Sequence, residues 1–322
     1  MLEDFLMDPV LAARWIFQRD LDVFQRVRLK MMWWVPFTMD SSGISTGKTI
    51  VDFIYANLRA MLLPALGEGQ EVGVYFFTFA MGKDTFWRYY STINAPIFAA
   101  QLGEVDNPDS TDKTAKRRDP SCWSASFKSG GAVFLPAPDV MGESKNQSSR
   151  RFNTLIVEEW TKFDASGNAI NAELIGRNTK ACFNQSHPLW ANHVKYMAHA
   201  EVQSHPAYKR YEDFQREIRK GNPFYAHITF SYKDFSDLLN HEARSFKKAY
   251  RADAIMALEK AQCTPDEVLS KLFGLWVKSG MGWYTEDALE AAVELGRQLG
   301  ILPMINRRQP MLKEVRPDAA PV

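Results

Sequence analysis

A loop of small residues that leads into Gly-Lys-Thr limits the possible folds of this chain more than any other feature. An apolar run at residues 32–38 precedes the loop, and the helix-like sequence IVDFIYANLRAML follows Thr49. Small residues let backbone N–H groups turn inward around phosphate oxygen atoms, and the N-terminus of a following helix adds partial positive charge. The order of strand, loop and helix therefore predicts a phosphate-binding P-loop.

The loop departs at one position from the usual spacing G-x-x-x-x-G-K-S/T. Ser42 stands where the first glycine belongs, and Gly43 follows one place late. We expect the Lys48 side chain to reach the β and γ phosphates of ATP and the Thr49 hydroxyl to bind Mg²⁺. The alternative is a chance Gly-Lys-Thr at the start of a helix. The predicted nucleotide-binding residues of the loop are Ser42, Gly43, Ile44, Ser45, Thr46, Gly47, Lys48 and Thr49.

Two adjacent carboxylates supply a second motif where the apolar segment 154–157 ends. Glu158 and Glu159 follow the P-loop by about 110 residues, a spacing that suits two strands of one sheet. Successive side chains at the end of a strand point in different directions. We predict that Glu158 holds Mg²⁺ through water and that Glu159 is the general base that activates the attacking water. The alternative is a buried strand that ends in solvated surface acids.

Apolar runs alternate with segments of helical periodicity through about the first 230 residues. This alternation is typical of strands joined by helical crossovers. It predicts an α/β fold, a P-loop NTPase core with a mostly parallel central sheet flanked by helices. A hairpin over residues 124–136, with its turn at Gly130 and Gly131, is expected to add antiparallel strands. The other expected strands are residues 32–38, 71–79, 154–157, 194–200 and 224–232.

Beyond residue 232 the periodicity becomes helical. Thr264 and Thr285 are expected N-caps, and the last residues are rich in proline and charge without an apolar face. The expected helices are residues 242–261, 265–273 and 285–299. We therefore predict three parts: a P-loop ATPase core over residues 1–235, a small helical linker subdomain over residues 236–305, and a linker or tail over residues 306–322.

Composition limits the possible partners. The 39 basic and 38 acidic side chains leave a formal net charge of +1, so any contact with DNA has to come from local charge. Basic clusters at residues 113–118 and 307–308 are candidates for this contact, with solvated surface as the alternative.

The three widely spaced cysteines suit neither a disulfide framework nor a metal site. No stretch approaches the roughly 18 apolar residues that span a bilayer, so we expect a soluble protein without a membrane partner.

With both motifs in place, the chain resembles the ATPase domain of the large terminase subunit of tailed bacteriophages over nearly its whole length. Phe24-Gln25 resembles the glutamine element of that family, which implies that Gln25 recognises adenine. Residues 127–138 resemble its glycine-turned hairpin. Residues 196–208 resemble its coupling motif, which senses the γ phosphate and implies a sensor role for His199. The alternative for His199 is a satisfied polar residue near a strand end.

The resemblance also implies an arginine near the γ phosphate. Arg150 and Arg151, just ahead of the acidic strand, are the candidates, with solvated charges in a polar loop as the alternative. Residues 273–276 and 282–286 resemble the helical linker that joins motor to nuclease in that family. Nothing after Pro303 has the length of a nuclease, so we expect no DNA cleavage by this chain alone.

The function that the resemblance implies is ATP hydrolysis that drives double-stranded DNA into a viral procapsid, in the cytoplasm of the host cell. The implied partners are double-stranded DNA, further copies of the chain in a homo-oligomeric ring, a portal protein and a small terminase subunit. Three alternatives stay open. They are a P-loop ATPase of the helicase kind, a nucleotide-gated binding module without efficient turnover, and a structural protein without a nucleotide site.

Overall fold

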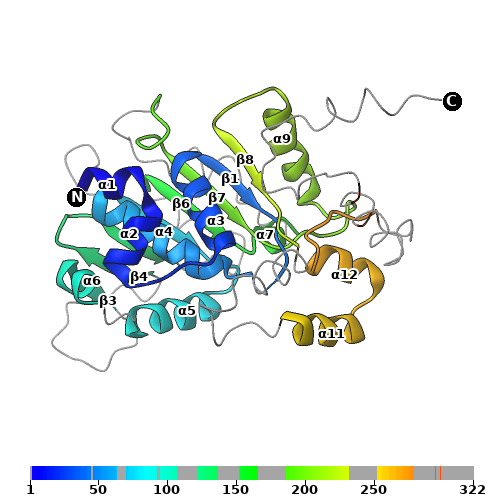
Figure 1. Cartoon of the computed structure of the whole chain (residues 1–322), viewed down its shortest axis with the longest axis horizontal. Helices are drawn as coiled ribbons and strands as arrows, with labels where there is room; N and C mark the ends of the chain where they lie inside the picture. The colour runs from blue at the N-terminus through cyan, green and yellow to red at the C-terminus, as the bar shows by residue number, and fades with distance from the viewer. Residues whose placement is uncertain are drawn as a thin grey trace.

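The computed structural model describes most of the chain. The described residues are 2–44, 46–63, 70–92, 95–106, 122–136, 152–165, 186–231 and 252–278, together with residues 294 and 298. Within them, one sheet carries helices on both faces (Figure 1).

The sheet has the strand order β3-β4-β5-β2-β6-β7-β1-β8. The strands from β5 to β8 in this order run parallel, while β4 pairs antiparallel with β5 and β3 pairs antiparallel with β4. The strands are β1 Phe37–Asp40, β2 Glu71–Tyr75, β3 Leu102–Asp106, β4 Cys122–Phe127, β5 Ala132–Pro136, β6 Thr154–Glu158, β7 His193–Met197 and β8 Tyr225–Ile228. The predicted α/β class with a mostly parallel sheet is confirmed.

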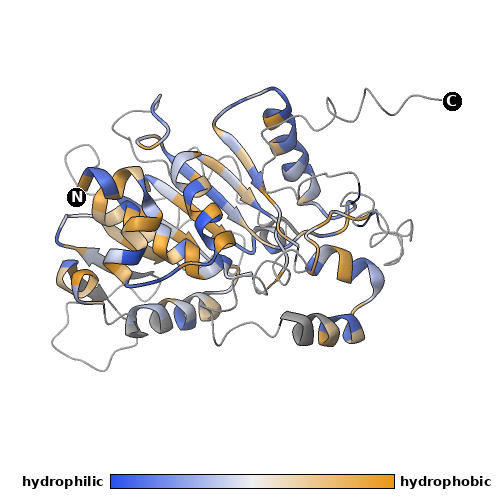
Figure 2. Cartoon of the chain, in the orientation of Figure 1, coloured by the Kyte–Doolittle hydropathy of each residue, from blue (hydrophilic) through white to orange (hydrophobic). Residues whose placement is uncertain are grey.

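Helices connect the parallel strands. The described helices are α1 Leu2–Met7, α2 Pro9–Phe17, α3 Val23–Trp34, α4 Lys48–Leu62, α5 Phe79–Thr92, α6 Pro96–Gln101, α7 Trp160–Ala165, α9 Tyr208–Arg219, α11 Ala252–Gln262 and α12 Pro265–Lys271. In Figure 2 the ribbon of α9 is mainly hydrophilic in colour, whereas the ribbon around α2 and α4 is largely hydrophobic. The difference fits their positions, because α4 is covered by α2 and α3 while α9 packs on β8 at the edge of the sheet.

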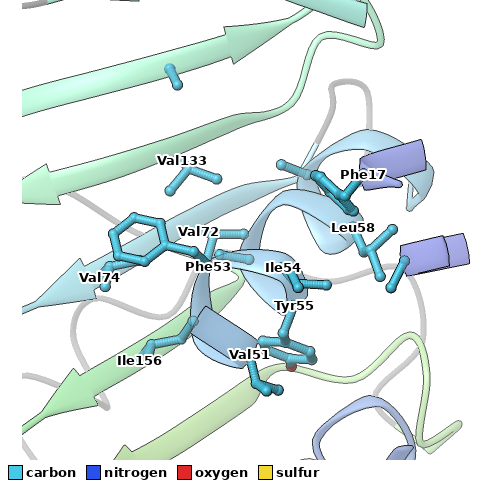
Figure 3. Close-up of a cluster of buried hydrophobic side chains, with 14 of the residues drawn as sticks. Phe17, Val51, Phe53, Ile54, Tyr55, Leu58, Val72, Val74, Val133 and Ile156 are labelled. Carbon is cyan, nitrogen blue, oxygen red and sulfur yellow. The ribbon is translucent and has the colours of Figure 1, made fainter. Parts of the chain in front are cut away.

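Each face of the sheet has its own hydrophobic core, because successive side chains of a strand point to opposite faces. On β6, Ile156 joins the core that contains α4, and Leu155 and Val157 join the core that contains Phe214 of α9. Figure 3 shows the first core, where side chains of α4 such as Phe53 lie against those of β2, β5 and β6. The buried helix α4 thereby holds its N-terminus at a fixed place beside the ends of the strands.

The prediction of a strand over residues 32–38 is wrong at its start. Asp22 caps α3 with a reciprocal capping box to Gln25, and the helix continues to Trp34. Met32 and Trp33 belong to the buried face of α3, and a short apolar run of this kind does not distinguish a helix from a strand. The helix ends before Pro36, because proline disfavours the helical conformation of the residue that precedes it.

Other boundaries also differ from the sequence prediction. The strand expected at residues 71–79 ends at Tyr75, the one at 194–200 ends at Met197, and the one at 224–232 is described from Tyr225 to Ile228. The hairpin of β4 and β5 is confirmed, with Gly130 at a φ of 86° in its turn. A Cβ atom on Gly131 would lie 2.0 Å from the carbonyl oxygen of Ala60, so glycine is required where the hairpin crosses the end of α4.

The helical prediction for the C-terminal part is confirmed where the structure describes it. Thr264 caps α12, and its capping box is completed by Glu267. Helix α11 coincides with the end of the expected helix 242–261. Thr285 and most of the expected helix 285–299 lie outside the described residues, as does the predicted tail.

Candidate active site

The predicted P-loop connects β1 to α4 at the carboxyl edge of the parallel strands (Figure 1). Gly47 is the N-cap of α4 and has a φ of 72°. A Cβ atom at Gly47 would lie 2.6 Å from Nε2 of Gln25. Glycine is favoured here by the left-handed backbone, and the Gln25 side chain occupies the space beside it. The structure therefore places Gln25, the predicted adenine contact, directly against the end of the loop.

A buried ion pair between Arg28 and Asp40 supports the loop. The Arg28 side chain of α3 donates to the Asp40 carboxylate at the end of β1, and also to the Thr46 carbonyl at 2.9 Å. Asp40 accepts a second hydrogen bond from the backbone N–H of Ser42 at 2.8 Å. Burial alone would raise the pKa of Asp40, but the positive charges of Arg28 and Lys48 outweigh it and lower that pKa. Asp40 therefore stays ionised and anchors both ends of the loop.

Lys48 folds back over the loop. Its amine donates to the carbonyl oxygens of Ser42 at 2.7 Å and Gly43 at 2.8 Å. Burial lowers the pKa of Lys48 to about 8. An anion next to this amine would raise its pKa again, because a negative charge stabilises the protonated form. The amine thus sits over the place where the sequence predicts phosphate.

The first half of the loop extends the pairing with β8. Ser41 donates its N–H to the carbonyl of Ile228, and Gly43 donates its N–H to the carbonyl of Phe230, both at 3.0 Å. The Ser42 hydroxyl accepts the N–H of Phe230 at 2.9 Å. This contact gives a physical reason for serine at the position where a glycine is usual. The N–H groups of Ser42, Gly43 and Ile44 all donate to protein acceptors, so the second half of the loop has to supply most N–H groups to a phosphate.

The end of helix α12 packs against the same loop. Ile44 donates its N–H to the carbonyl of Lys271 at 2.8 Å. A Cβ atom on Gly43 would lie 2.5 Å from the carbonyl oxygen of Leu272. The late position of this glycine therefore has a cause, because α12 leaves no room for a side chain at residue 43.

The acidic end of β6 meets the start of α4. Glu158 is 4% exposed, and its pKa is raised by burial, with hydrogen bonds to Asp52 and Thr49 opposing this in part. The pKa of Asp52, one turn further along α4, is raised well above its usual value by burial, by the charge of Glu158 and by its hydrogen bond with Glu158. The fold therefore brings the two predicted metal residues, Thr49 and Glu158, together from segments that are far apart in the sequence.

These groups suit a magnesium ion. Mg²⁺ prefers hydroxyl, carboxylate and water oxygens, and it commonly keeps several waters. The Oε1 atom of Glu158 is buried and, apart from a contact with the Asp52 carboxyl group, has no hydrogen-bond partner among the described residues. Thr49 and Glu158 would hold the ion, which would supply positive charge next to the phosphate groups.

Glu159 turns away from Glu158. Its φ is 54°, in the left-handed region that non-glycine residues rarely adopt. Its carboxylate forms an ion pair of 2.7 Å with Lys162 on α7, and both side chains are partly exposed. The left-handed residue is what separates the two acids, one facing Thr49 and the other facing solvent.

The predicted sensor segment lies beside the loop. Ala198 donates its N–H to the carbonyl of Asp40 at 3.1 Å, so the end of β7 adjoins the start of the P-loop. The His199 ring instead lies 3.1 Å from the Glu201 carboxylate. Burial alone would raise the pKa of Glu201, but its contact with His199 lowers it. The structure thus gives His199 a polar partner near the strand end.

Several predicted residues lie outside the described residues. These are Ser45, Arg150 and Arg151 and the basic clusters at residues 113–118 and 307–308. In turn, sequence reasoning missed Arg28, Asp40, Asp52 and the contact of 2.6 Å between the Ser41 hydroxyl and the His227 ring. A charged residue at the end of β1 was a usable signal for Asp40. A carboxylate at the third position after Thr49 was one for Asp52.

Comparison with solved structures identifies the fold. The HK97 bacteriophage large terminase aligns with a TM-score of 0.56 at 10% identity, over 84% of this chain and 55% of that one. The ATPase domain of the Thermus phage P74-26 large terminase aligns with a TM-score of 0.50 at 11% identity, over 81% and 96%. A large terminase from a thermophilic bacteriophage aligns with a TM-score of 0.51 at 14% identity, over 80% and 54%.

This chain therefore has the fold of phage large-terminase ATPase domains, and it spans about half the length of the HK97 protein. No protein-family model matches the sequence, and a search of curated proteins finds no match.

Proposed function

We propose that this chain hydrolyses ATP and uses the energy to move double-stranded DNA into a viral procapsid, as the ATPase part of a large terminase subunit. One observation carries the proposal. The P-loop residue Thr49 meets the buried acid Glu158 at the edge of a sheet whose fold is that of phage large-terminase ATPase domains. A P-loop hydroxyl with an acid at the end of a nearby strand is the arrangement that holds Mg²⁺ on a nucleoside triphosphate.

Lys48 and Gln25 have proposed parts in binding ATP. Bound Mg²⁺ and ATP would present a γ phosphate whose charge is partly neutralised. Lys48 would exchange the carbonyls of Ser42 and Gly43 for the β and γ phosphates, and the phosphate charge would keep its amine protonated. Gln25 lies beside Gly47, which supports its proposed contact with the adenine base.

Glu159 is the proposed general base. It has to exchange its ion pair with Lys162 for the attacking water, and its partly exposed position leaves it free to do so. Arg150 or Arg151 is the proposed source of positive charge near the γ phosphate. The contact between Ala198 and Asp40 supports a sensor role for the segment that contains His199, because movement of the loop would reach β7 directly.

The proposed partners follow from the proposed motor. They are double-stranded DNA, further copies of the chain in a homo-oligomeric ring, a portal protein and a small terminase subunit, all in the cytoplasm of the host cell. Among the described helices, none combines the length and the apolar character that crossing a bilayer requires.

Phosphate release from ATP and Mg²⁺, with and without double-stranded DNA, tests the proposal. We expect Glu159→Gln to lower turnover by at least about 100-fold, the usual effect of losing a general base, without preventing nucleotide binding. The matched control is Glu217→Gln, the same substitution at a glutamate of α9 that pairs with Lys220. It should leave turnover unchanged. DNA should stimulate turnover of the wild type and the control.

A nucleotide-gated binding module is the second candidate function. It is favoured by the loop itself, since the N–H groups of Ser42, Gly43 and Ile44 are committed to protein acceptors. Nucleotide binding without phosphate release, in the presence of DNA and equally in Glu159→Gln, would support the module against the motor. Absence of nucleotide binding would reject both.

A further inference from the structure

Asp52 is a buried acid that the proposed mechanism does not yet use. It lies on α4 three residues after Thr49, and residues three apart share one face of a helix. Its side chain is completely buried. The face of α4 that carries the Thr49 hydroxyl therefore also carries a carboxyl group, one turn deeper in the protein.

Apart from a contact with each other that requires a shared proton, the carboxyl oxygens of Asp52 and Oε1 of Glu158 have no hydrogen-bond partner among the described residues. Buried polar groups in native proteins are nearly always paired, because burial without a hydrogen bond is unfavourable. Two carboxyl groups beside each other repel when both are ionised. Two adjacent buried carboxyl groups with no other hydrogen-bond donor among the described residues thus point to a ligand that carries positive charge or donates hydrogen bonds.

The nearby cations of the chain already have other partners. Arg28 donates to the Asp40 carboxylate and to Thr46, and Lys48 donates to two carbonyls of the P-loop. Both influence the electrostatics at Asp52 without forming a hydrogen bond to it. Apart from its contact with Glu158, the Asp52 carboxyl group therefore receives no hydrogen bond within the described part of the chain.

We propose that Asp52 is a second carboxylate of the magnesium site, placed to accept hydrogen bonds from water molecules that the ion retains. This inference rests on the proposed function, because it concerns the ion that accompanies ATP. Mg²⁺ gives up its waters reluctantly, and those waters need acceptors. With Thr49 and Glu158 at the ion, Asp52 supplies such acceptors from the adjacent turn of α4. It acts as a positioning residue, since it holds the ion through water.

A different role for Asp52 is electrostatic support of the charged Lys48. The two roles make different predictions about metal. Support of Lys48 would affect nucleotide binding whether or not Mg²⁺ is present. A role at the metal site affects only the dependence on Mg²⁺.

The test is binding of a fluorescent ATP analogue by the full chain, titrated with Mg²⁺ and repeated in EDTA. We compare the wild type, Asp52→Asn, Asp52→Ser and the control Asp84→Asn on the exposed surface of α5. Both variants replace a buried ionisable group by a smaller or equally sized neutral one, so circular dichroism should show folded proteins. Asn preserves the shape of the side chain, and Ser leaves room for water if Asn packs poorly.

We expect both Asp52 variants to need about tenfold more Mg²⁺ for half-maximal binding, the usual effect of losing an outer-shell partner of a metal. The affinity of both variants for the analogue in EDTA should equal that of the wild type. The control Asp84→Asn should equal the wild type under both conditions. An unchanged Mg²⁺ midpoint, or an equal loss of affinity in EDTA, would overturn the role of Asp52 and leave the ATPase proposal intact. Failure of the wild type to bind the analogue under any condition would instead overturn the proposed function, and this inference with it.

Discussion

Glu159 combines an unfavourable backbone conformation with the position predicted for the general base. A left-handed conformation costs a non-glycine residue about 1–2 kcal/mol, and such strain often occurs at functional sites. Here the strain has a visible result, since it points the Glu159 carboxylate away from the buried Glu158. At this position stability and activity therefore make opposite demands on the side chain.

We predict that Glu159→Gly is more stable than Glu159→Ala by about 1 kcal/mol, because glycine adopts a φ of 54° without a Cβ clash. Both variants should lose ATP turnover, since both lack the carboxylate. Urea denaturation measures the first effect and phosphate release the second. Equal stability of the two variants would show that the backbone at residue 159 is not strained.

Packing of α4 on β7 encloses basic groups without a described acid among them. The His193 ring lies 2.6 Å from the Tyr55 hydroxyl, and Arg59 donates to carbonyls of the segment that precedes β7. Lys195 donates to the carbonyl of Pro36 at 3.1 Å. The pKa of His193 is lowered well below its usual value by burial first and then by the charges of Arg59 and Lys195. The fold therefore keeps this histidine neutral.

This lowered pKa predicts a loss of stability in acid. The unfolded chain takes up a proton at His193 below about pH 6.5, whereas the folded chain resists it, so protons favour unfolding. The contribution of neutral His193 to the free energy of unfolding should be fully present well above pH 6.5. Below that pH the free energy of unfolding should fall by up to about 1.4 kcal/mol per pH unit. Urea denaturation at pH 7.5, 6.5 and 5.5 checks this. His193→Gln should show a smaller slope, and an identical slope would assign the acid sensitivity to other groups.

The P-loop joins parts of the chain that lie far apart in sequence. It pairs with the end of β8, adjoins the end of β7 and contacts the end of α12. The segment after α12, which contains Trp276, contacts α9 and the start of α7. Trp276 stacks on Tyr211 of α9 at 5.2 Å between ring centroids and lies 6.1 Å from Trp160, the residue after Glu159. Movement of the loop on binding a nucleotide would therefore displace α12 and the segment that follows it.

We predict that Gly43→Ala disturbs this connection. The new Cβ atom would lie 2.5 Å from the carbonyl oxygen of Leu272, so the end of α12 has to shift, at a cost of about 1–3 kcal/mol. Nucleotide affinity should fall as well, and hydrogen exchange over residues 265–277 should become faster. Gly221→Ala is the control, because its φ of 78° is strained but its Cβ atom would meet nothing within 4 Å. It should lose stability without losing affinity. Unchanged exchange in Gly43→Ala would show that the contact with α12 is weak.

Local signals explain which predictions from the sequence were confirmed. The β4 and β5 hairpin and the Thr264 cap depend on neighbouring residues, so their patterns are visible in a short window. The predicted start of β1 was wrong because buried apolar residues such as Met32 and Trp33 occur in helices and in strands alike. Only packing distinguishes the two. The P-loop and the acidic strand could be located because their patterns are local. The contacts that support them could not be predicted because they depend on packing.

The sequence by itself determined the α/β fold with a mostly parallel sheet, the place of the P-loop between a strand and α4, and the acids that end β6. Only the tertiary structure decided that Arg28 supports the loop through Asp40, that Asp52 is buried beside Glu158, and that α12 packs on Gly43. The physical reason is distance along the chain. Strand, loop and helix signals arise between adjacent residues, whereas a hydrogen bond from Ile44 to Lys271 exists only after the intervening chain has folded.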